Sequence, residues 1–537
     1  MTDKRNDDVL AALKSGAIDG KVSRRRFMEG ALYAGLTVSA ASTLWSTTVL
    51  AGTPQKGGHF RVGLDDGNTT DSLDPALYEG QFQISMSHTH RNYLTEITPD
   101  NVVGPELAES WEASDDASEW VLKLRKGVEF HNGKSFDATD ALDSLNHHRG
   151  EDTKSAGKAL LASVEEIKVD DPHTLIVKLN AGSADFPYVL TDYHFTMLPS
   201  DGEGNVAWEK GEGTGGYVLE EFEPGVRATM KRFPNYWKEG RAHFDEVSYY
   251  AIPDVNARQT GLKTGDLDAM IEVDLKTAKL LDRDPNVVVV EVPSGTHITM
   301  PMHTDVAPFD NNDVRLALKY AINREEALQK ILKGHGTLGN DHPIGAVLPY
   351  HAAGLEQRTY DPDKARHHLK KAGMENLKVS FSASDVPMPN GVDFAILFQE
   401  SAKKAGIEID VVREPNDGYW SNVWLKKPFS LVSWGQRPTP DVMFTLAYSA
   451  GADWNESHFQ HERFNKLLLE ARAELDDAKR GEMYYEMQQI MRDEGGTIIP
   501  FFRNYVFAHR ANVMHDEKLS GNWALDGSRG GERWWFG

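Results

Sequence analysis

The side chains in this sequence that most readily do chemistry are its twenty histidines, because imidazole binds metal ions and transfers protons. Four pairs lie close together along the chain: His88/His90, His147/His148, His367/His368 and His458/His461. Only the last pair has the three-residue spacing that places two side chains on one helix face. There is no cysteine and no His-Glu-x-x-His motif, so we predict no metal site.

Motifs for catalysis and nucleotide binding are also missing. Gly127–Ser135 resembles a phosphate-binding loop, but five residues rather than four separate its glycines. Gly211–Gly216 lacks the strand and helix that such a loop joins, and no Gly-x-Ser-x-Gly turn is present. No pair of carboxylates stands out among 81 Asp and Glu residues. We therefore predict that the protein is not an enzyme and needs no cofactor.

The N-terminal residues carry the features of an export signal. Ser23–Phe27, with three consecutive arginines, precede an uncharged stretch at 30–50 and a plausible cleavage site at 49–51. The arrangement is similar to a twin-arginine signal, although Met28 and Glu29 depart from its usual Leu-Lys. A membrane anchor is the alternative, but the stretch is rich in Ala, Ser and Thr and barely reaches the ~20 residues that a span needs.

Cleavage at this site yields a mature protein that begins near Gly52. Because the sequence has no cysteine, the mature chain carries neither a disulfide nor a lipid-modified cysteine behind the signal. We therefore expect a periplasmic protein that is exported by the twin-arginine route and has no lipid anchor.

Composition excludes some partners. The 537-residue chain has a formal net charge of −23, which repels nucleic acid and anionic lipid. Hydrophobic residues make up 40%, as in ordinary globular proteins. The ~486 residues after the signal are too many for one hydrophobic core, so two or three domains are expected.

The first half of the chain is predicted to be rich in strands. Residues 57–64 alternate in polarity like an opening strand, and Trp120–Phe130 is predicted to form a strand and turn. Asn132-Gly133 is a strong signal for a tight turn. Asp137 then has the position of a helix N-cap, with acidic Asp140 three residues later.

The second half is predicted to alternate helices and strands. A helix face is expected from Val314 to Ile322, and Asp361-Pro362 opens another helix that Gly373 ends. A strand at 377–381, a helix with its apolar face at 394–405 and a strand at 407–412 then form a parallel α/β unit. Two more helices are expected between Glu462 and Arg492.

The order of short segments resembles the extracellular solute-binding proteins of family 5, the dipeptide, oligopeptide and nickel group that serves ABC importers. The resemblance covers essentially all of the chain after the signal. The matching segments are Ser72–Ala76, Pro105–Trp111, Trp120–Gly133, Gly213–Tyr217, Phe233–Lys238, Pro308–Leu318, Tyr360–Arg366 and Ile499–Phe502.

The resemblance implies an α/β protein with the two-lobed periplasmic-binding-protein fold of type II, with three domains, in the cluster of peptide-binding proteins. Hinge closure around a ligand would bring the lobes together. The chain is expected to cross between lobes near 293–299 and 500–503. The expected parts are a signal (1–51), an N-terminal lobe with a main domain (52–95, 213–297 and 501–537) and an extra domain (96–212), and a C-terminal lobe (298–500).

The resemblance also implies that Ser433–Asp441 lines the ligand cleft, with Trp434, Gly435 and Gln436 at its centre. In the family a Trp is followed three residues later by an Asp that pairs with the α-amino group of a peptide. Here that position holds Arg437, whose guanidinium suits a carboxylate or phosphate. Two alternatives stay open: Arg437 pairs internally with Asp441, or Asp441 supplies the contact to the amine.

Other positions are expected near the ligand by the same resemblance, each with core packing or a loop role as the alternative. They are Tyr78, His303, Thr304, Phe501 and Phe502.

The implied function is the periplasmic substrate-binding component of an ABC importer. It would capture a peptide or another small organic solute, carboxylate-bearing solutes among them, and deliver it to permease subunits that work with cytoplasmic ATPases. We expect a monomer that binds no nucleic acid. The alternatives are a nickel- or haem-binding protein and a periplasmic hydrolase.

Overall fold

The computed structural model describes residues 9–10, 13, 22, 24–34, 54–416 and 418–537 of the chain. The predicted cleavage site at 49–51 lies outside these residues, as does Ser23. Helix α2 (Arg24–Tyr33) contains the three arginines and buries Phe27 and Ala31 in a small apolar cluster. In the described part of the chain, no helix has both the length and the apolar character needed to span a bilayer.

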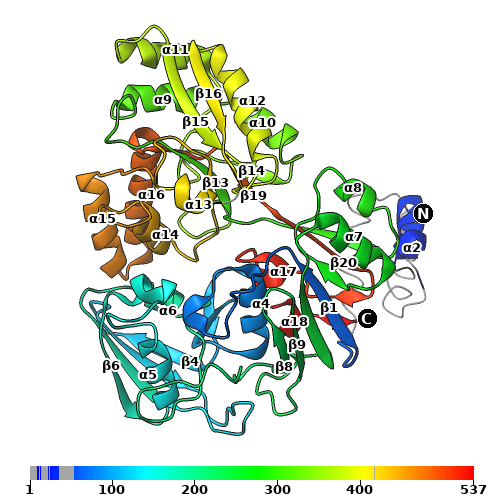
Figure 1. Cartoon of the computed structure of the whole chain (residues 1–537). Coiled ribbons are helices and arrows are strands. Elements are labelled where there is room, and N and C mark those ends of the chain that lie inside the picture. Colours follow the sequence, from blue (N-terminus) through cyan, green and yellow to red (C-terminus); the bar gives the residue numbers. More distant parts are fainter. Residues whose placement is uncertain (1–8, 11–12, 14–21, 23, 35–53, 417) are drawn as a thin grey trace, which may run out of the picture.

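The main sheet of the N-terminal lobe has seven strands in the order β12-β20-β11-β1-β10-β9-β8. The predicted opening strand is confirmed as β1, which runs parallel to both of its neighbours. Helices α4 (Gln81–His90) and α7 (Val255–Thr264) lie beside this sheet (Figure 1). The strands are β1 (His59–Leu64), β8 (Tyr217–Glu223), β9 (Arg227–Arg232), β10 (Glu246–Ala251), β11 (Ala269–Met270), β12 (Val287–Val292) and β20 (Tyr505–Arg510).

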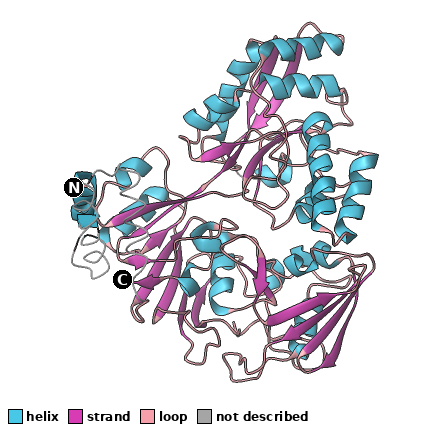
Figure 2. Cartoon of the chain, turned by 180° about the vertical axis from the view of Figure 1, so that it is seen from behind, coloured by secondary structure: helices cyan, strands magenta, loops and turns pink. Residues whose placement is uncertain are grey.

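A second sheet of the same lobe has four antiparallel strands in the order β4-β5-β7-β6 and appears as a separate fan in Figure 2. The predicted helix start is confirmed: Asp137 caps α5 (Ala138–Asn146) by accepting from the backbone N–H of Thr139 at 2.8 Å. The Asp140 side chain in turn accepts from the Asp137 N–H at 3.0 Å, which completes a capping box. The strands are β4 (Ala108–Ala113), β5 (Glu119–Leu124), β6 (Val164–Asp171) and β7 (Thr174–Leu179).

The C-terminal lobe contains the predicted parallel α/β unit. Strands β15 (Leu377–Ala383) and β16 (Ile407–Arg413) pair in parallel, and α12 (Gly391–Lys403) connects them. The predicted face of α9 (Asn312–Ala321) is buried in the core, and Asp361 caps α11 (Pro362–Lys371) as expected. The two late helices are α15 (Glu462–Ala473) and α16 (Asp477–Glu494).

A further sheet of this lobe carries the segments that lead to the other lobe. It contains β13 (His297–Pro301), β14 (Gly336–Leu338), β17 (Val432–Trp434), β18 (Thr497–Ile498) and β19 (Phe501–Arg503). Because β12 and β20 belong to the N-terminal sheet, the chain crosses between β12 and β13 and again at Asn504 (Figure 1). Phe501–Arg503 thus pair within the C-terminal lobe, slightly beyond the expected boundary at 501.

Each of the three regions encloses its own apolar cluster. One cluster contains Leu122 and Phe136 below the four-stranded sheet, another contains Phe60 and Trp534 at the seven-stranded sheet, and a third contains Phe381 and other residues of the C-terminal lobe. Separate cores are what hinged lobes require, since each can then move as a rigid body. The residue limits of the three domains stay a prediction.

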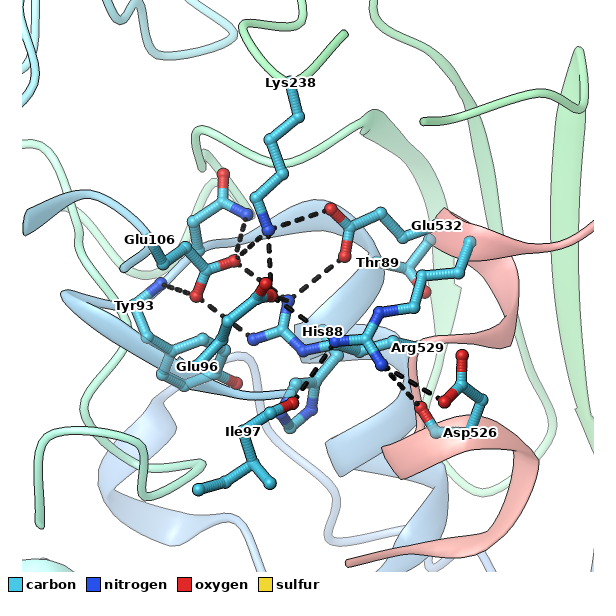
Figure 3. Close-up of polar contacts among 12 residues, drawn as sticks. His88, Thr89, Tyr93, Glu96, Ile97, Glu106, Lys238, Asp526, Arg529 and Glu532 are labelled. Atoms are coloured by element: carbon cyan, nitrogen blue, oxygen red, sulfur yellow. Dashed lines mark hydrogen bonds and ion pairs between the residues drawn. The ribbon is translucent and has the colours of Figure 1, made fainter. Parts of the chain in front are cut away.

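A buried ion cluster fastens the C-terminal end of the chain inside the N-terminal lobe (Figure 3). Glu106 is fully buried and accepts from Lys238 at 2.7 Å and from both terminal nitrogens of Arg529 at 2.9 and 3.1 Å. Glu532 pairs with the same two bases, at 3.0 and 3.1 Å. We name Glu96, Glu106, Lys238, Arg529, Glu532 and Arg533 the N-lobe ion cluster.

Candidate ligand-binding cleft

A cavity of about 940 Å³ lies between the two lobes. Its N-terminal wall includes Asp192, Tyr193 and His194 together with Trp523. Its C-terminal wall includes residues 436–438 and the buried helix α14 (Pro440–Ala447) with the loop that follows it. The volume is that of a pocket for a small organic molecule, and a cavity shared by two lobes is the expected place for a ligand that holds them together.

Arg437 offers an unsatisfied cation to this cavity. Within the described residues its guanidinium makes one weak hydrogen bond, 3.5 Å long, to the carbonyl oxygen of Gln436. It lies over the ring of Trp434, with its central carbon 5.9 Å from the ring centroid. Stacking on an indole holds the side chain in place while its N–H donors stay free. The Gln436 side chain is turned toward the hinge, where it accepts from the N–H of Gly295 at 2.7 Å.

Asp192 offers an anion from the opposite lobe. Its Oδ1 accepts from the backbone N–H of His194 at 3.1 Å and lies 2.5 Å from His194 Nδ1. The second nitrogen of that ring faces the carbonyl oxygen of Tyr78 at 3.0 Å. Burial alone would raise the pKa of Asp192, but the charges of His194 and, more weakly, Arg437 lower it. The carboxylate is therefore ionised at neutral pH.

Asp441 is paired with Arg472, and not with Arg437 as one of the two open alternatives has it. Its two oxygens accept from Nε of Arg472 in α15, at 3.1 and 3.3 Å. Burial raises the pKa of Asp441 to about 6, against the opposing charge of Arg472. The alternative that Arg437 pairs with Asp441 is therefore not what the structure contains, and Asp441 is less available to an amine than Asp192.

Aromatic rings cover the C-terminal side of the cavity. Trp454 lines it and contacts Trp434 and Trp424, with ring centroids 5.9 and 5.8 Å apart. Glu456 lies beneath these rings and accepts from Trp424 Nε1 at 3.0 Å and from Thr299 at 2.6 Å. Burial raises the pKa of Glu456 to about 7. On the other lobe Tyr193 and Trp523 pack edge to face at 5.7 Å.

The lobes touch at one rim of the cavity. The N–H of Ala184 donates to the carbonyl oxygen of Arg472 at 2.7 Å, across the gap between lobes. Beside it, Asp185 pairs with Arg480 at 2.5 Å, and both side chains are almost completely buried. We name Asp185 and Arg480 the rim pair. The contacts exist only when the lobes are close, so they favour the closed arrangement.

The structure brings three of the predicted ligand residues to the cavity wall: Gln436, Arg437 and Asp441. Trp434 and Gly435 adjoin it, since Trp434 stacks with Arg437 and a Cβ at Gly435 would stand 3.9 Å from Trp523. Direct contact of any of these residues with a ligand stays a prediction.

The other five predicted residues lie elsewhere. Tyr78 is fully buried and its hydroxyl accepts from Arg91 at 2.8 Å, although its carbonyl supports His194. Phe501 and Phe502 pack inside the C-terminal lobe, against Phe394 and His297 respectively. His303 and Thr304 are displaced from the cleft because β13 carries the chain away from the hinge; Thr304 lines a second cavity in the C-terminal lobe. The prediction for these residues rests on a position beside a family segment or, for Phe501 and Phe502, at the second crossing between lobes, and neither position fixes where a side chain points.

Asp192 and Trp523 were missed by sequence reasoning. In a chain with 81 acidic residues one Asp carries no distinguishing signal.

Comparison with known proteins shows the family of the chain. Residues 102–456 match the family described as bacterial extracellular solute-binding proteins, family 5 middle. The di/tripeptide-binding protein 1 of Pseudomonas aeruginosa is 25% identical over 89% of this chain and 95% of its own. The glutathione-binding protein GsiB of Escherichia coli is 26% identical over 86% and 90%.

Solved structures share the fold. The periplasmic binding protein DppA from Helicobacter pylori, in complex with the peptide STSA, superposes with a TM-score of 0.76. It is 22% identical, and the match covers 90% of this chain and 98% of that one. The predicted periplasmic-binding-protein fold is thereby confirmed, and the chain belongs to the bacterial extracellular solute-binding proteins of family 5.

Proposed function

We propose that the protein captures a small zwitterionic solute, of the size and charge of a short peptide, and delivers it to an ABC permease in the bacterial inner membrane. Solute binding is the role of the family. The observation that carries the choice of solute is the position of Arg437 and Asp192 on opposite walls of one cavity, each with hydrogen-bonding capacity to spare.

Opposite charges on opposite lobes couple binding to closure. An anionic group of the ligand pairs with Arg437 of the C-terminal lobe, and an ammonium group pairs with Asp192 of the N-terminal lobe. Only the closed form makes both contacts at once, so a ligand with both groups shifts the equilibrium toward that form. A ligand with one group loses part of this preference.

The relatives support this class of solute. Di- and tripeptides, glutathione and the peptide STSA are named for three similar proteins, and each such compound carries an ammonium group and a carboxylate. The aromatic walls formed by Trp454 and by Tyr193 with Trp523 would cover the apolar remainder of the guest.

Chemically blocked ligands test the proposal directly. Native mass spectrometry of mature protein from its own periplasm identifies the co-purified compound. That compound, its N-acetyl form and its C-terminal amide are then titrated by calorimetry into the wild type, Asp192→Asn and Arg437→Gln. We expect acetylation to weaken binding to the wild type but not to Asp192→Asn, and amidation to weaken binding to the wild type but not to Arg437→Gln.

The outcome is decided by this pattern of matched losses. A co-purified haem, or a guest without an ionised group, would contradict the proposal, as would equal losses in all three proteins. Product appearing during the titration would favour the hydrolase alternative.

Export by the twin-arginine route, a periplasmic location and the absence of a lipid anchor form part of the same proposal. Arg24 and Arg25 precede Phe27 in the order that this signal requires. Replacing both with Lys should trap the precursor in the cytoplasm, and so should a host without the twin-arginine translocase. Mature protein that still reaches the periplasm in that host would exclude the route, and N-terminal sequencing tests for a start near Gly52.

A further inference from the structure

Two loops of the C-terminal lobe bring two imidazoles and a carboxylate together outside the ligand cleft. His303 and Asp305 follow β13, and His458 lies in the loop before α15. The rings of His303 and His458 stack with centroids 4.0 Å apart, and Asp305 Oδ1 lies 2.9 Å from His458 Nδ1. One donor atom of each residue lies within 4.8 Å of the other two. We name these three residues the His-Asp cluster.

The two loops are fixed to each other by their backbones. The N–H of Thr304 donates to the carbonyl oxygen of Ser457 at 2.8 Å, and the Thr304 hydroxyl donates to that of His458 at 3.0 Å. His458 adopts a left-handed backbone with φ of 53°, which is uncommon for a residue other than glycine. The backbones of the two loops are therefore held together without help from a bound ion, and the strained position of His458 is one that the surrounding contacts impose.

His303 has the state that a metal ligand needs. Its side chain is only 6% exposed, and no hydrogen bond to its ring occurs among the residues that the structure describes. A neutral imidazole whose nitrogen makes no hydrogen bond keeps that lone pair available to a metal ion.

Space for an ion and its water ligands is present. Asp305 and His458 line a cavity of about 470 Å³. The guanidinium of Arg315, which also borders it, is occupied by the carbonyl oxygens of Phe309 and Glu494, each at 2.7 Å. It therefore does not fill the position of a cation.

The N-lobe ion cluster also groups possible metal ligands, but protein cations already occupy it. Glu96, Glu106 and Glu532 also bring donor atoms within 4.8 Å of one another. Lys238 lies within 3.0 Å of all three carboxylates, so protein cations already neutralise them. Within the described residues, the His-Asp cluster has no such resident cation.

We propose that His303, Asp305 and His458 bind one divalent transition-metal ion, Zn²⁺ in the first place, on the C-terminal lobe. Two imidazoles and one carboxylate are the donors that zinc and its neighbours prefer, and water completes the coordination. None of the three residues lines the inter-lobe cavity, so the site is separate from the solute cleft. Its effect is to tie the loop after β13 to the loop before α15.

Zinc titration of tag-free mature protein, stripped with a chelator and dialysed, tests the site. Calorimetry should detect one equivalent of Zn²⁺, and thermal unfolding should shift upward with zinc concentration, because the ion binds the folded state alone. Mg²⁺ and Ca²⁺ should produce neither effect, since both prefer all-oxygen ligands. Cobalt substitution should give the visible absorption of a four-coordinate site.

Matched variants assign the binding to these residues. Asp305→Asn changes an exposed side chain and should weaken zinc binding by about tenfold or more, as His458→Ala should. Asp310→Asn removes another exposed carboxylate of the same cavity, and His367→Ala removes an exposed imidazole elsewhere; both should bind zinc like the wild type. Absence of stoichiometric zinc binding, or full binding by folded Asp305→Asn and His458→Ala, would overturn the proposal.

Discussion

The N-lobe ion cluster and the charges of the ligand cleft use the same residue types in opposite ways. Glu106 has no exposed surface and receives hydrogen bonds from Asn92, Tyr93, Lys238 and Arg529. Arg437, in contrast, has one weak bond to a carbonyl oxygen within the described residues. In the N-lobe ion cluster the protein supplies the partner of every charge. In the cleft each lobe supplies one charge, and the ligand is expected to supply its partner.

The difference shows how a binding site is distinguished from a structural ion network. A buried charge is costly unless its partners are present, so a complete network stabilises one conformation. In an incomplete network the charges stay partly hydrated, and a bound ligand can supply the missing partners. Arg437 and Asp192 are both only partly buried, as this explanation requires.

The largest effect is expected from breaking the complete network. Arg529→Met leaves Glu106 and Glu532 with one base fewer in a dry environment, and should lower the free energy of unfolding by about 3–5 kcal/mol. Urea denaturation measures it. Lys378→Met, which breaks an exposed ion pair with Glu408, is the control and should leave the unfolding free energy unchanged. Equal stability of the two variants would refute the distinction between the clusters.

The second effect is the dependence of stability on pH that the buried carboxyl of Glu456 produces. Glu456 accepts hydrogen bonds but forms no ion pair with a base among the described residues, and burial raises its pKa to about 7. A carboxyl whose pKa is raised by folding stabilises the protein below its unfolded pKa, and this contribution is lost as pH rises through about 7. Glu456→Gln should therefore stabilise the protein at pH 8.5, on the order of 2 kcal/mol, and have little effect at pH 4.5.

Melting temperatures of Glu456→Gln and the wild type across this pH range check the sign. Glu486→Gln is a suitable control, because its carboxyl is half-exposed and its pKa is lowered by the hydrogen bond from Arg463. A stabilisation by Glu456→Gln that is the same at both pH values would contradict the account.

The third effect belongs to the incomplete pair. Arg437→Gln should weaken affinity for the anionic guest roughly 10- to 100-fold, which corresponds to about 1.4–2.8 kcal/mol for a charged hydrogen bond. Stability without ligand should hardly change, because Arg437 forms no ion pair with a carboxylate in the part of the chain that the structure describes. Calorimetry and urea denaturation measure the two quantities, and Arg413→Gln, at an exposed position, is the control. A loss of stability without a loss of affinity would place Arg437 with the structural charges.

The smallest effect is expected from the rim pair. Asp185→Asn weakens a contact that only the closed form makes, so the closed population falls and the apparent dissociation constant rises a few-fold. Stopped-flow kinetics should show faster ligand release. Glu486→Gln breaks the pair with Arg463 inside one lobe and should leave release unchanged. Identical release rates for Asp185→Asn and the wild type would remove the rim pair from the closing mechanism.

Local signals in the sequence predicted the elements well. The Asp137 capping box, the Asp361 cap and the α9 face are decided by residues three or four positions apart, and all formed as expected. The parallel pair β15–β16 follows from the strand–helix–strand order alone.

Partners far apart in the sequence could not be predicted in the same way. Asp441 pairs with Arg472 rather than with nearby Arg437, because α14 and α15 pack together and direct Arg472 toward it. His303 meets His458 rather than a neighbour, whereas His461 is used to cap α15. These pairings depend on how helices and loops pack against one another, which a single sequence does not show.

The most direct test of the central claim is small-angle X-ray scattering of mature protein, first stripped of its guest by unfolding and refolding and then saturated with the identified zwitterion. Completion of the Arg437–Asp192 pair by the guest predicts a smaller radius of gyration with ligand for the wild type, and a much reduced change for Arg437→Gln at equal saturation. Identical curves with and without bound ligand in the wild type would contradict the account.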